Sequence, residues 1–253
     1  MPYYGKERDT QMNIAQTVFT VIAAAVTALY LILPRIKKGV NGTLLKTASS
    51  FCFVMLGTVS FVSFVNSGEF APDGSITGLS AGIVLIGLVL GLIGDVLLDV
   101  AHKIGDDVLI GGMSAFALQH VAIMAASSVG NHGFRPLLLV ISLAVGFAAA
   151  FADVSLNKKS GNFDFRGLEM PSVVYATLLA SAFVYYLLLA IAEDPLFFTA
   201  AVAMALFLVS DVILSFLYFK KGLKNRRALG AVNLATYYAA QIVFALSVGS
   251  VYR

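Results

Sequence analysis

The sequence predicts an all-α polytopic membrane protein, and its composition, its long apolar segments and its distribution of charge support that prediction. Of its 253 residues, 59% are hydrophobic and only 12% are charged, and the mean hydropathy is +0.88. A soluble domain typically has about a quarter of its residues charged. The apolar side chains must therefore face lipid. The single cysteine, Cys52, excludes an internal disulfide and a metal site built from several cysteines.

Eight apolar segments are long enough to cross a bilayer, which takes about 17 to 25 helical residues. They lie at residues 14–33, 44–65, 78–101, 108–129, 134–152, 170–192, 195–219 and 228–250. Backbone groups in hydrocarbon must be paired within their own segment, and the alternating pattern of barrel strands is missing. We therefore expect eight transmembrane helices packed in one bundle.

No linker separates these spans into groups, so we expect a single domain over residues 1–253. A polar stretch, residues 1–13, precedes the first span, which is long enough to remain as an anchor rather than a cleaved signal peptide. The third span is rich in small residues, which let helices approach closely. These are Gly82, Gly87, Gly91 and Gly94. Between the fifth and sixth spans, Asp153–Glu169 is expected to be a surface loop.

Lysine and arginine are distributed unevenly between the two sides of the predicted membrane. The segments between spans 1–2, 3–4, 5–6 and 7–8 hold 13 of the 17, and the termini and remaining segments hold 4. Because cytoplasmic loops carry the excess of basic residues, both termini are predicted on the non-cytoplasmic side. The membrane would be that of the endoplasmic reticulum in a eukaryote and the inner (plasma) membrane in a bacterium.

Ionisable side chains inside the spans indicate a functional site, because each costs at least a few kcal/mol unless it is partnered or hydrated. Asp95 and Asp99 lie in the third span, Asp211 in the seventh, and His120 in the fourth. Further polar residues accompany them in spans 6, 7 and 8: Tyr175, Ser210 and the i, i+4, i+8 stripe of Asn233, Tyr237 and Gln241. At 1.5 Å per helical residue, most of these groups lie roughly 8 to 20 Å from the predicted cytoplasmic ends of their spans. Their similar depth predicts a cavity that opens toward the cytoplasm.

Five short motifs in spans 3 to 8 resemble, in order and spacing, those of the YhhN family of membrane proteins. They are Gly94-Asp95-Val96-Leu97-Leu98, Gly112-x-x-x-Phe116-x-x-x-His120, Pro171-x-x-x-Tyr175, Ser210-Asp211-x-x-Leu214 with Phe219, and Thr236-Tyr237-Tyr238-x-x-Gln241. Spans 1 and 2 fit the family only in general character. The chain departs from the family pattern at Ile123, where Tyr is usual, and at Ser215, where Ala is common. The resemblance implies eight spans, as counted above.

The resemblance also implies an activity, because the family includes lysoplasmalogenases. These hydrolyse the vinyl-ether bond of a lysoplasmalogen to a fatty aldehyde and a glycerophospho-ethanolamine or -choline. Protonating the vinyl ether needs a carboxylic acid, and the resulting oxocarbenium ion needs an anion nearby, as in glycosidases. We expect Asp95 and Asp211 to be this catalytic pair, in either assignment of roles. Residues expected to contact substrate or water are Asp99, His120, Tyr175, Ser210, Asn233, Tyr237 and Gln241.

The expected partners are a lysophospholipid and the bilayer, with no cofactor, no metal and no nucleic acid. These polar residues also have structural alternatives. Asp95 and Asp211 would form a hydrogen-bonded pair between helices, Asp99 would be solvated near the interface, and His120 and the stripe in span 8 would hydrogen-bond to neighbouring helices. His102 and His132, near loop ends, are expected at the surface. The basic residues of the loop after span 7 either reflect only the orientation of the chain in the membrane or bind a lipid phosphate. These residues are Lys220, Lys221, Lys224, Arg226 and Arg227.

Two other functions remain open at this point. A zinc hydrolase would draw ligands from several helices, but only His120 lies deep and no HxxxH or HExxH motif occurs. A proton-coupled transporter also places acids inside its spans. The similar sequences around Asp95 and Asp211, four spans apart, would then mark a parallel repeat.

Overall fold

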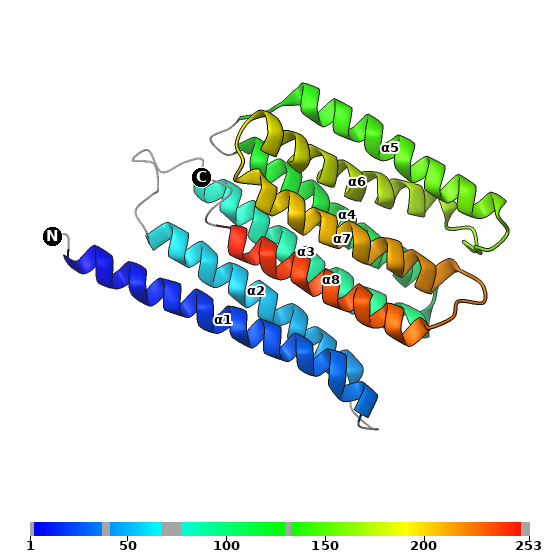
Figure 1. Cartoon of the computed structure of the whole chain (residues 1–253), viewed down its shortest axis with the longest axis horizontal. Coiled ribbons are helices and arrows are strands. Elements are labelled where there is room, and N and C mark those ends of the chain that lie inside the picture. The colour runs from blue at the N-terminus through cyan, green and yellow to red at the C-terminus, as the bar shows by residue number, and fades with distance from the viewer. Residues whose placement is uncertain (1–2, 37–40, 67–76, 130–132, 249–253) are drawn as a thin grey trace.

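The part of the chain that the computed structural model describes is a bundle of eight long helices with roughly aligned axes (Figure 1). The structure describes residues 3–36, 41–66, 77–129 and 133–248. The helices of these ranges are α1 (Tyr3–Ile36), α2 (Gly42–Asn66), α3 (Thr77–Ile104), α4 (Asp106–Val129), α5 (Pro136–Lys159), α6 (Glu169–Ala192), α7 (Phe197–Phe219) and α8 (Arg226–Ser247). Each contains a segment long and apolar enough to cross a membrane. In the described ranges the predicted all-α architecture is therefore confirmed, with eight helices that could each cross a membrane, and the orientation of the termini stays a prediction.

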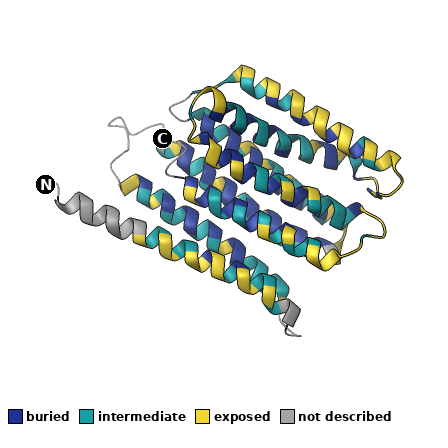
Figure 2. Cartoon of the chain, in the orientation of Figure 1, coloured by how far each residue is buried: buried dark blue, intermediate teal, exposed yellow. Residues whose placement is uncertain are grey.

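Consecutive helices pack as pairs, α1 with α2, α3 with α4, α5 with α6, and α7 with α8. The helix α8 also contacts α1, α2 and α3, while α6 contacts α4 and α7. The helices α1 and α5 lie at opposite edges of the bundle (Figure 1). Among the described helices α5 packs against α6 alone, and its outer face is exposed along much of its length (Figure 2). Leu137 and Val140 on α5 are examples of side chains that would face lipid.

Local sequence explains several of the helix ends. The single residue Gly105 joins α3 to α4 with a φ of +133°, which glycine adopts without steric cost. Pro136 opens α5 in its first turn, where the missing N–H has no helical partner to lose. Asn225 precedes α8 in the left-handed conformation, which asparagine tolerates better than most residues.

Three of the four glycines noted in span 3 lie at close helix contacts. A Cβ on Gly91 would lie 2.7 Å from both Gln119 Oε1 and Gln241 Nε2, and a Cβ on Gly94 would lie 2.7 Å from the ring of Phe116. On Gly87 it would lie 3.3 Å from Ile123. At the fourth glycine, Gly82, no atom of another described helix lies within 4 Å of that position, so the expectation of close approach is wrong there.

The expected surface loop Asp153–Glu169 is wrong in two respects. First, α5 continues to Lys159, because a helix keeps its hydrogen bonds after its sequence turns polar. Second, residues 160–168, here called the cap loop, turn back onto the bundle and bury Phe163 and Phe165. The cap loop also pairs with the chain that follows α7. The amide of Asp164 donates to the carbonyl of Phe219 at 2.8 Å.

Candidate active site

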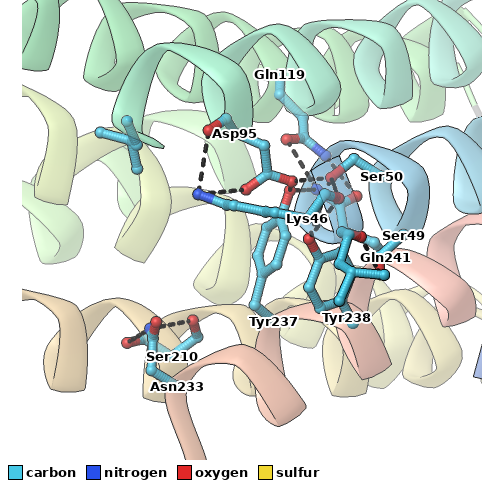
Figure 3. Close-up of polar contacts among 12 residues, drawn as sticks. Lys46, Ser49, Ser50, Asp95, Gln119, Ser210, Asn233, Tyr237, Tyr238 and Gln241 are labelled. Atoms are coloured by element: carbon cyan, nitrogen blue, oxygen red, sulfur yellow. Dashed lines mark hydrogen bonds and ion pairs between the residues drawn. The ribbon is translucent and has the colours of Figure 1, made fainter. Parts of the chain in front are cut away.

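The carboxylate of Asp95 accepts hydrogen bonds from two other helices (Figure 3). Ser50 of α2 donates to Oδ2 at 2.6 Å, and Tyr237 of α8 donates to the same oxygen at 2.7 Å. The ammonium of Lys46, also on α2, lies 3.5 Å from Oδ1. Asp95 is buried, and such an ion pair is stable only if further hydrogen bonds satisfy its oxygens. This arrangement supplies two hydrogen bonds to Oδ2 and places a cation beside Oδ1.

Lys46 is the main residue that the sequence prediction missed. It lies near the start of the predicted 44–65 span, and the count of basic residues above assigns it to the loop between spans 1 and 2. In the structure α2 begins at Gly42, so Lys46 lies within the helix and points at α3 (Figure 3). Its ammonium also donates to the backbone carbonyl of Asp95 at 3.1 Å. Only 11% of its side chain is exposed.

A second layer of polar contacts supports these residues. Gln241 donates to the hydroxyl of Tyr237 at 3.0 Å, and it exchanges amide hydrogen bonds with Gln119 at 2.8 and 3.3 Å. Tyr238 donates to the carbonyl of Lys46 at 3.1 Å. Gln119 was also missed, although an amide in the middle of an apolar span is the same signal that identified Gln241.

Asp211 belongs to a separate hydrogen-bonded group. The hydroxyl of Tyr175 on α6 donates to its Oδ2. Asn233 of α8 does not reach the carboxylate but donates to the neighbouring Ser210, to the carbonyl at 2.7 Å and to Oγ at 2.8 Å. The side chains of Asp95 and Asp211 thus bond to different partners. The structure therefore contradicts the alternative of a hydrogen-bonded pair of aspartates.

Asp211 and Tyr175 line a cavity of about 110 Å³ between α3, α4, α5, α6 and α7, here called the apolar cavity. Most of its wall is aliphatic or aromatic, with Phe163 and Phe165 of the cap loop among the lining residues. Its other polar lining residues are Asp153, Asn157, Ser172, Ser215 and Tyr218. The sequence prediction missed Asp153 as a lining residue because it placed that residue in a loop. It is nevertheless largely exposed and accepts a hydrogen bond from Asn157 at 2.9 Å.

Aromatic rings connect the two polar groups. Phe116, Phe207 and Tyr237 meet edge to face, with ring centroids 5.3 to 5.8 Å apart, and Phe116 also lines the apolar cavity. His120 packs against Phe207 at 4.7 Å and against Tyr175 at 6.0 Å. It is fully buried, and neither of its ring nitrogens has a hydrogen-bond partner in the described part of the chain. Such a group costs free energy unless a water or ligand satisfies it.

The remaining predicted site residues lie apart. Asp99 is half-buried one helical turn from Asp95 and belongs to neither hydrogen-bonded group. His132 and the side chain of His102 fall outside what the structure describes. Within the described ranges, no three His, Cys, Asp or Glu side chains lie close enough to hold a metal ion together.

The model of the YhhN family matches residues 43–248, from the first turn of α2 through α8. The match includes all five motifs and also the second span, which the motifs alone did not cover. No curated protein and no solved structure matches the chain. Because the family model covers most of its length, the chain belongs to the YhhN family.

Proposed function

We propose that this protein hydrolyses the vinyl-ether bond of a lysoplasmalogen to a fatty aldehyde and a glycerophospho-ethanolamine or -choline. The observation that carries the proposal is a buried carboxyl group, Asp211, on the wall of a largely apolar cavity inside a bundle of helices long enough to span a membrane. The hydrocarbon chain of a lipid can pack against the apolar side chains of this wall, and acid-catalysed cleavage needs one proton donor at the ether. Membership of the YhhN family is consistent with a lysoplasmalogenase-like hydrolase.

The two aspartates would have different roles. Asp211 touches the apolar cavity, so we assign it as the acid that protonates the outer alkene carbon. Tyr175 donates to Oδ2 of Asp211, and we assign the reacting proton to Oδ1. Asp95 does not line the cavity, and both of its oxygens face donors or Lys46. It would act as a fixed negative charge that favours the oxocarbenium ion from nearby.

The remaining steps need one water molecule. Water adds to the ether-bearing carbon of the oxocarbenium ion and returns a proton to the Asp211 carboxylate. The resulting hemiacetal then breaks its bond to the glycerol oxygen. Its hydroxyl loses a proton as the aldehyde forms, the glycerol oxygen gains one, and the aldehyde is released. His120, with two unsatisfied nitrogens beside Tyr175, is the group we assign to hold this water.

The test is aldehyde release by purified protein from a lysoplasmalogen and from its saturated ether analogue. We expect aldehyde from the vinyl ether alone, with turnover abolished in Asp211→Asn and Asp95→Asn. Ser215→Ala is the matched control, because Ser215 lines the same cavity one helical turn from Asp211 and its hydroxyl bonds to its own helix. It should retain activity within a few fold. Near-normal release from both aspartate variants, or loss of turnover under strong chelation, would contradict the proposal.

A further inference from the structure

A second cavity of about 270 Å³ adjoins the apolar cavity at the end of the bundle that carries the cap loop. The two cavities share Leu109 and Tyr218 in their walls. Their linings differ in character, because the second cavity includes the side chains of Arg166 and Arg226 and is largely polar. We call it the arginine cavity.

Each arginine is held in place by a contact that leaves part of its guanidinium available. Arg226 donates to the carbonyl of Leu217 at the end of α7. Arg166 pairs through Nη1 with Asp106 Oδ1 at 3.1 Å, and its guanidinium also lies 5.9 Å from the ring centre of Phe219. A guanidinium has five N–H donors, so each of these arginines has donors left for an anion.

The backbone adds positive potential at the same place. The helix α4 begins at Asp106, and Gly105, Asp106 and Leu109 all line the arginine cavity. The first turn of a long helix carries unpaired N–H groups and the positive end of the helix dipole, which attract anions. Asp106 is the one acid in the lining and already pairs with Arg166.

We propose that Arg166 and Arg226 bind the phosphate of a lysophospholipid headgroup while its alkenyl chain occupies the apolar cavity. The inference rests on the proposed function, because it places one substrate across both cavities. Arginine pairs are well suited to phosphate, which accepts their paired N–H groups. The excess of basic residues in cytoplasmic loops explains why these loops are basic. It does not explain why these two arginines line a cavity next to the one that contains Asp211.

The dimensions of the substrate fit this placement. Tyr218 lies seven residues beyond Asp211 on α7, which is about 10 Å along the helix axis. In a lysoplasmalogen, the protonated alkene carbon and the phosphorus are separated by seven bonds, or roughly 9 Å at bond lengths near 1.5 Å. A phosphate beside Tyr218 and the arginines therefore leaves the vinyl ether near Asp211.

The experiment measures binding, so that its outcome does not depend on turnover. The ligands are a saturated 1-alkyl lysophospholipid and the corresponding 1-alkylglycerol, which lacks the phosphate, each titrated calorimetrically into detergent-solubilised protein. We expect Arg166→Gln and Arg226→Gln each to weaken lysophospholipid binding at least tenfold and to change alkylglycerol binding less than twofold. Lys159→Gln removes an exposed positive charge at the nearby end of α5 and should change neither.

Several results would overturn the assignment. If the arginine variants bind both lipids more weakly by the same factor, the arginines have a structural role only. If lysophospholipid binding is unchanged, they do not contact the phosphate. Two controls separate loss of phosphate recognition from loss of fold. Arg166→Lys and Arg226→Lys keep the positive charge, and the melting temperature of every variant shows whether it is folded. We expect millimolar inorganic phosphate to compete with the lysophospholipid in the unmodified protein. Free phosphate that binds as tightly as the lipid would show that the cavity serves another anion. Failure of the proposed hydrolysis would show instead as binding without aldehyde release.

Discussion

The ammonium of Lys46 reaches both the side chain and the main chain of Asp95. It lies 3.5 Å from the carboxylate oxygen Oδ1 and donates to the backbone carbonyl of the same residue at 3.1 Å. This double contact fixes α2 against α3 at the level of the candidate site. The pair is therefore a structural link between helices, and it holds in place the Asp95 carboxylate to which we assign the fixed charge.

Lys46→Met should lower both stability and activity. Removing one partner of a buried ion pair leaves an uncompensated charge and typically costs about 3–5 kcal/mol. Denaturant titration of the detergent-solubilised protein measures the change in stability, and aldehyde release measures the change in activity. The double variant Lys46→Met with Asp95→Asn should regain much of the stability while staying inactive. A double variant that regains activity would contradict the role of Asp95 as a required anion.

Tyr175→Phe should reduce kcat about 10- to 100-fold and leave KM nearly unchanged, because it removes the donor that orients the Asp211 carboxyl group. The control is Tyr186→Phe on the same helix, because Tyr186 is fully buried, its hydroxyl donates to the carbonyl of Ile123, and it does not line the apolar cavity. That control should lose stability and keep its kcat. Equal kinetic losses in the two variants would show a general packing effect on α6.

His120→Phe should abolish or strongly reduce turnover without destabilising the fold. The ring of Phe fits the aromatic surroundings of Phe207 and removes two nitrogens that have no described partner, so the desolvation cost of those nitrogens disappears. Melting temperature and aldehyde release are measured on the same preparation. A marked drop in melting temperature would mean that His120 has a structural hydrogen bond instead of a role in holding water.

Gly91→Ala should destabilise the protein by about 1–3 kcal/mol, because the added methyl group would push apart the Gln119–Gln241 amide pair. Gly82→Ala on the same helix is the matched control. The space around Gly82 is open, so alanine there should be neutral or stabilising by up to about 1 kcal/mol through helix propensity. Denaturant unfolding of both variants checks the difference, and similar values would contradict the observed packing of α3.

Asp106→Asn should lower KM for a lysophospholipid several fold and leave kcat unchanged. Arg166 then loses its competing carboxylate, 3.1 Å away, and the arginine cavity becomes more positive. Steady-state kinetics at two salt concentrations measure this, with the smaller effect expected at high salt because surface charge is screened. An increase in KM would indicate that the ion pair positions Arg166 rather than competing with the phosphate.

The fold and part of the site could be predicted from sequence because a bilayer imposes simple rules. Eight apolar segments of sufficient length had to be helices, and acids within them had to be partnered. That reasoning identified Asp95, Asp211, Tyr237 and Gln241, which the structure places in two neighbouring groups.

The residues that were missed depend on information that hydropathy does not carry. Lys46 lies near a span end, and only the packing of α2 against α3 shows that it turns inward. The last turns of α5 carry Asp153, Lys158 and Lys159, so an apolar window ends before the helix does. Phe163 and Phe165 lie in a short polar segment, and their burial follows from tertiary pairing with the chain after α7.

The peripheral position of α5 has a kinetic consequence. Within the described structure this helix rests on α6 alone, yet Asp153, Val154 and Asn157 of α5 form part of the apolar cavity wall. We expect a lipid to pass this edge sideways from the surrounding leaflet, with its headgroup kept at the interface. The relevant substrate concentration is then the mole fraction in the bilayer, so diluting the substrate with inert lipid should slow turnover even at constant bulk concentration.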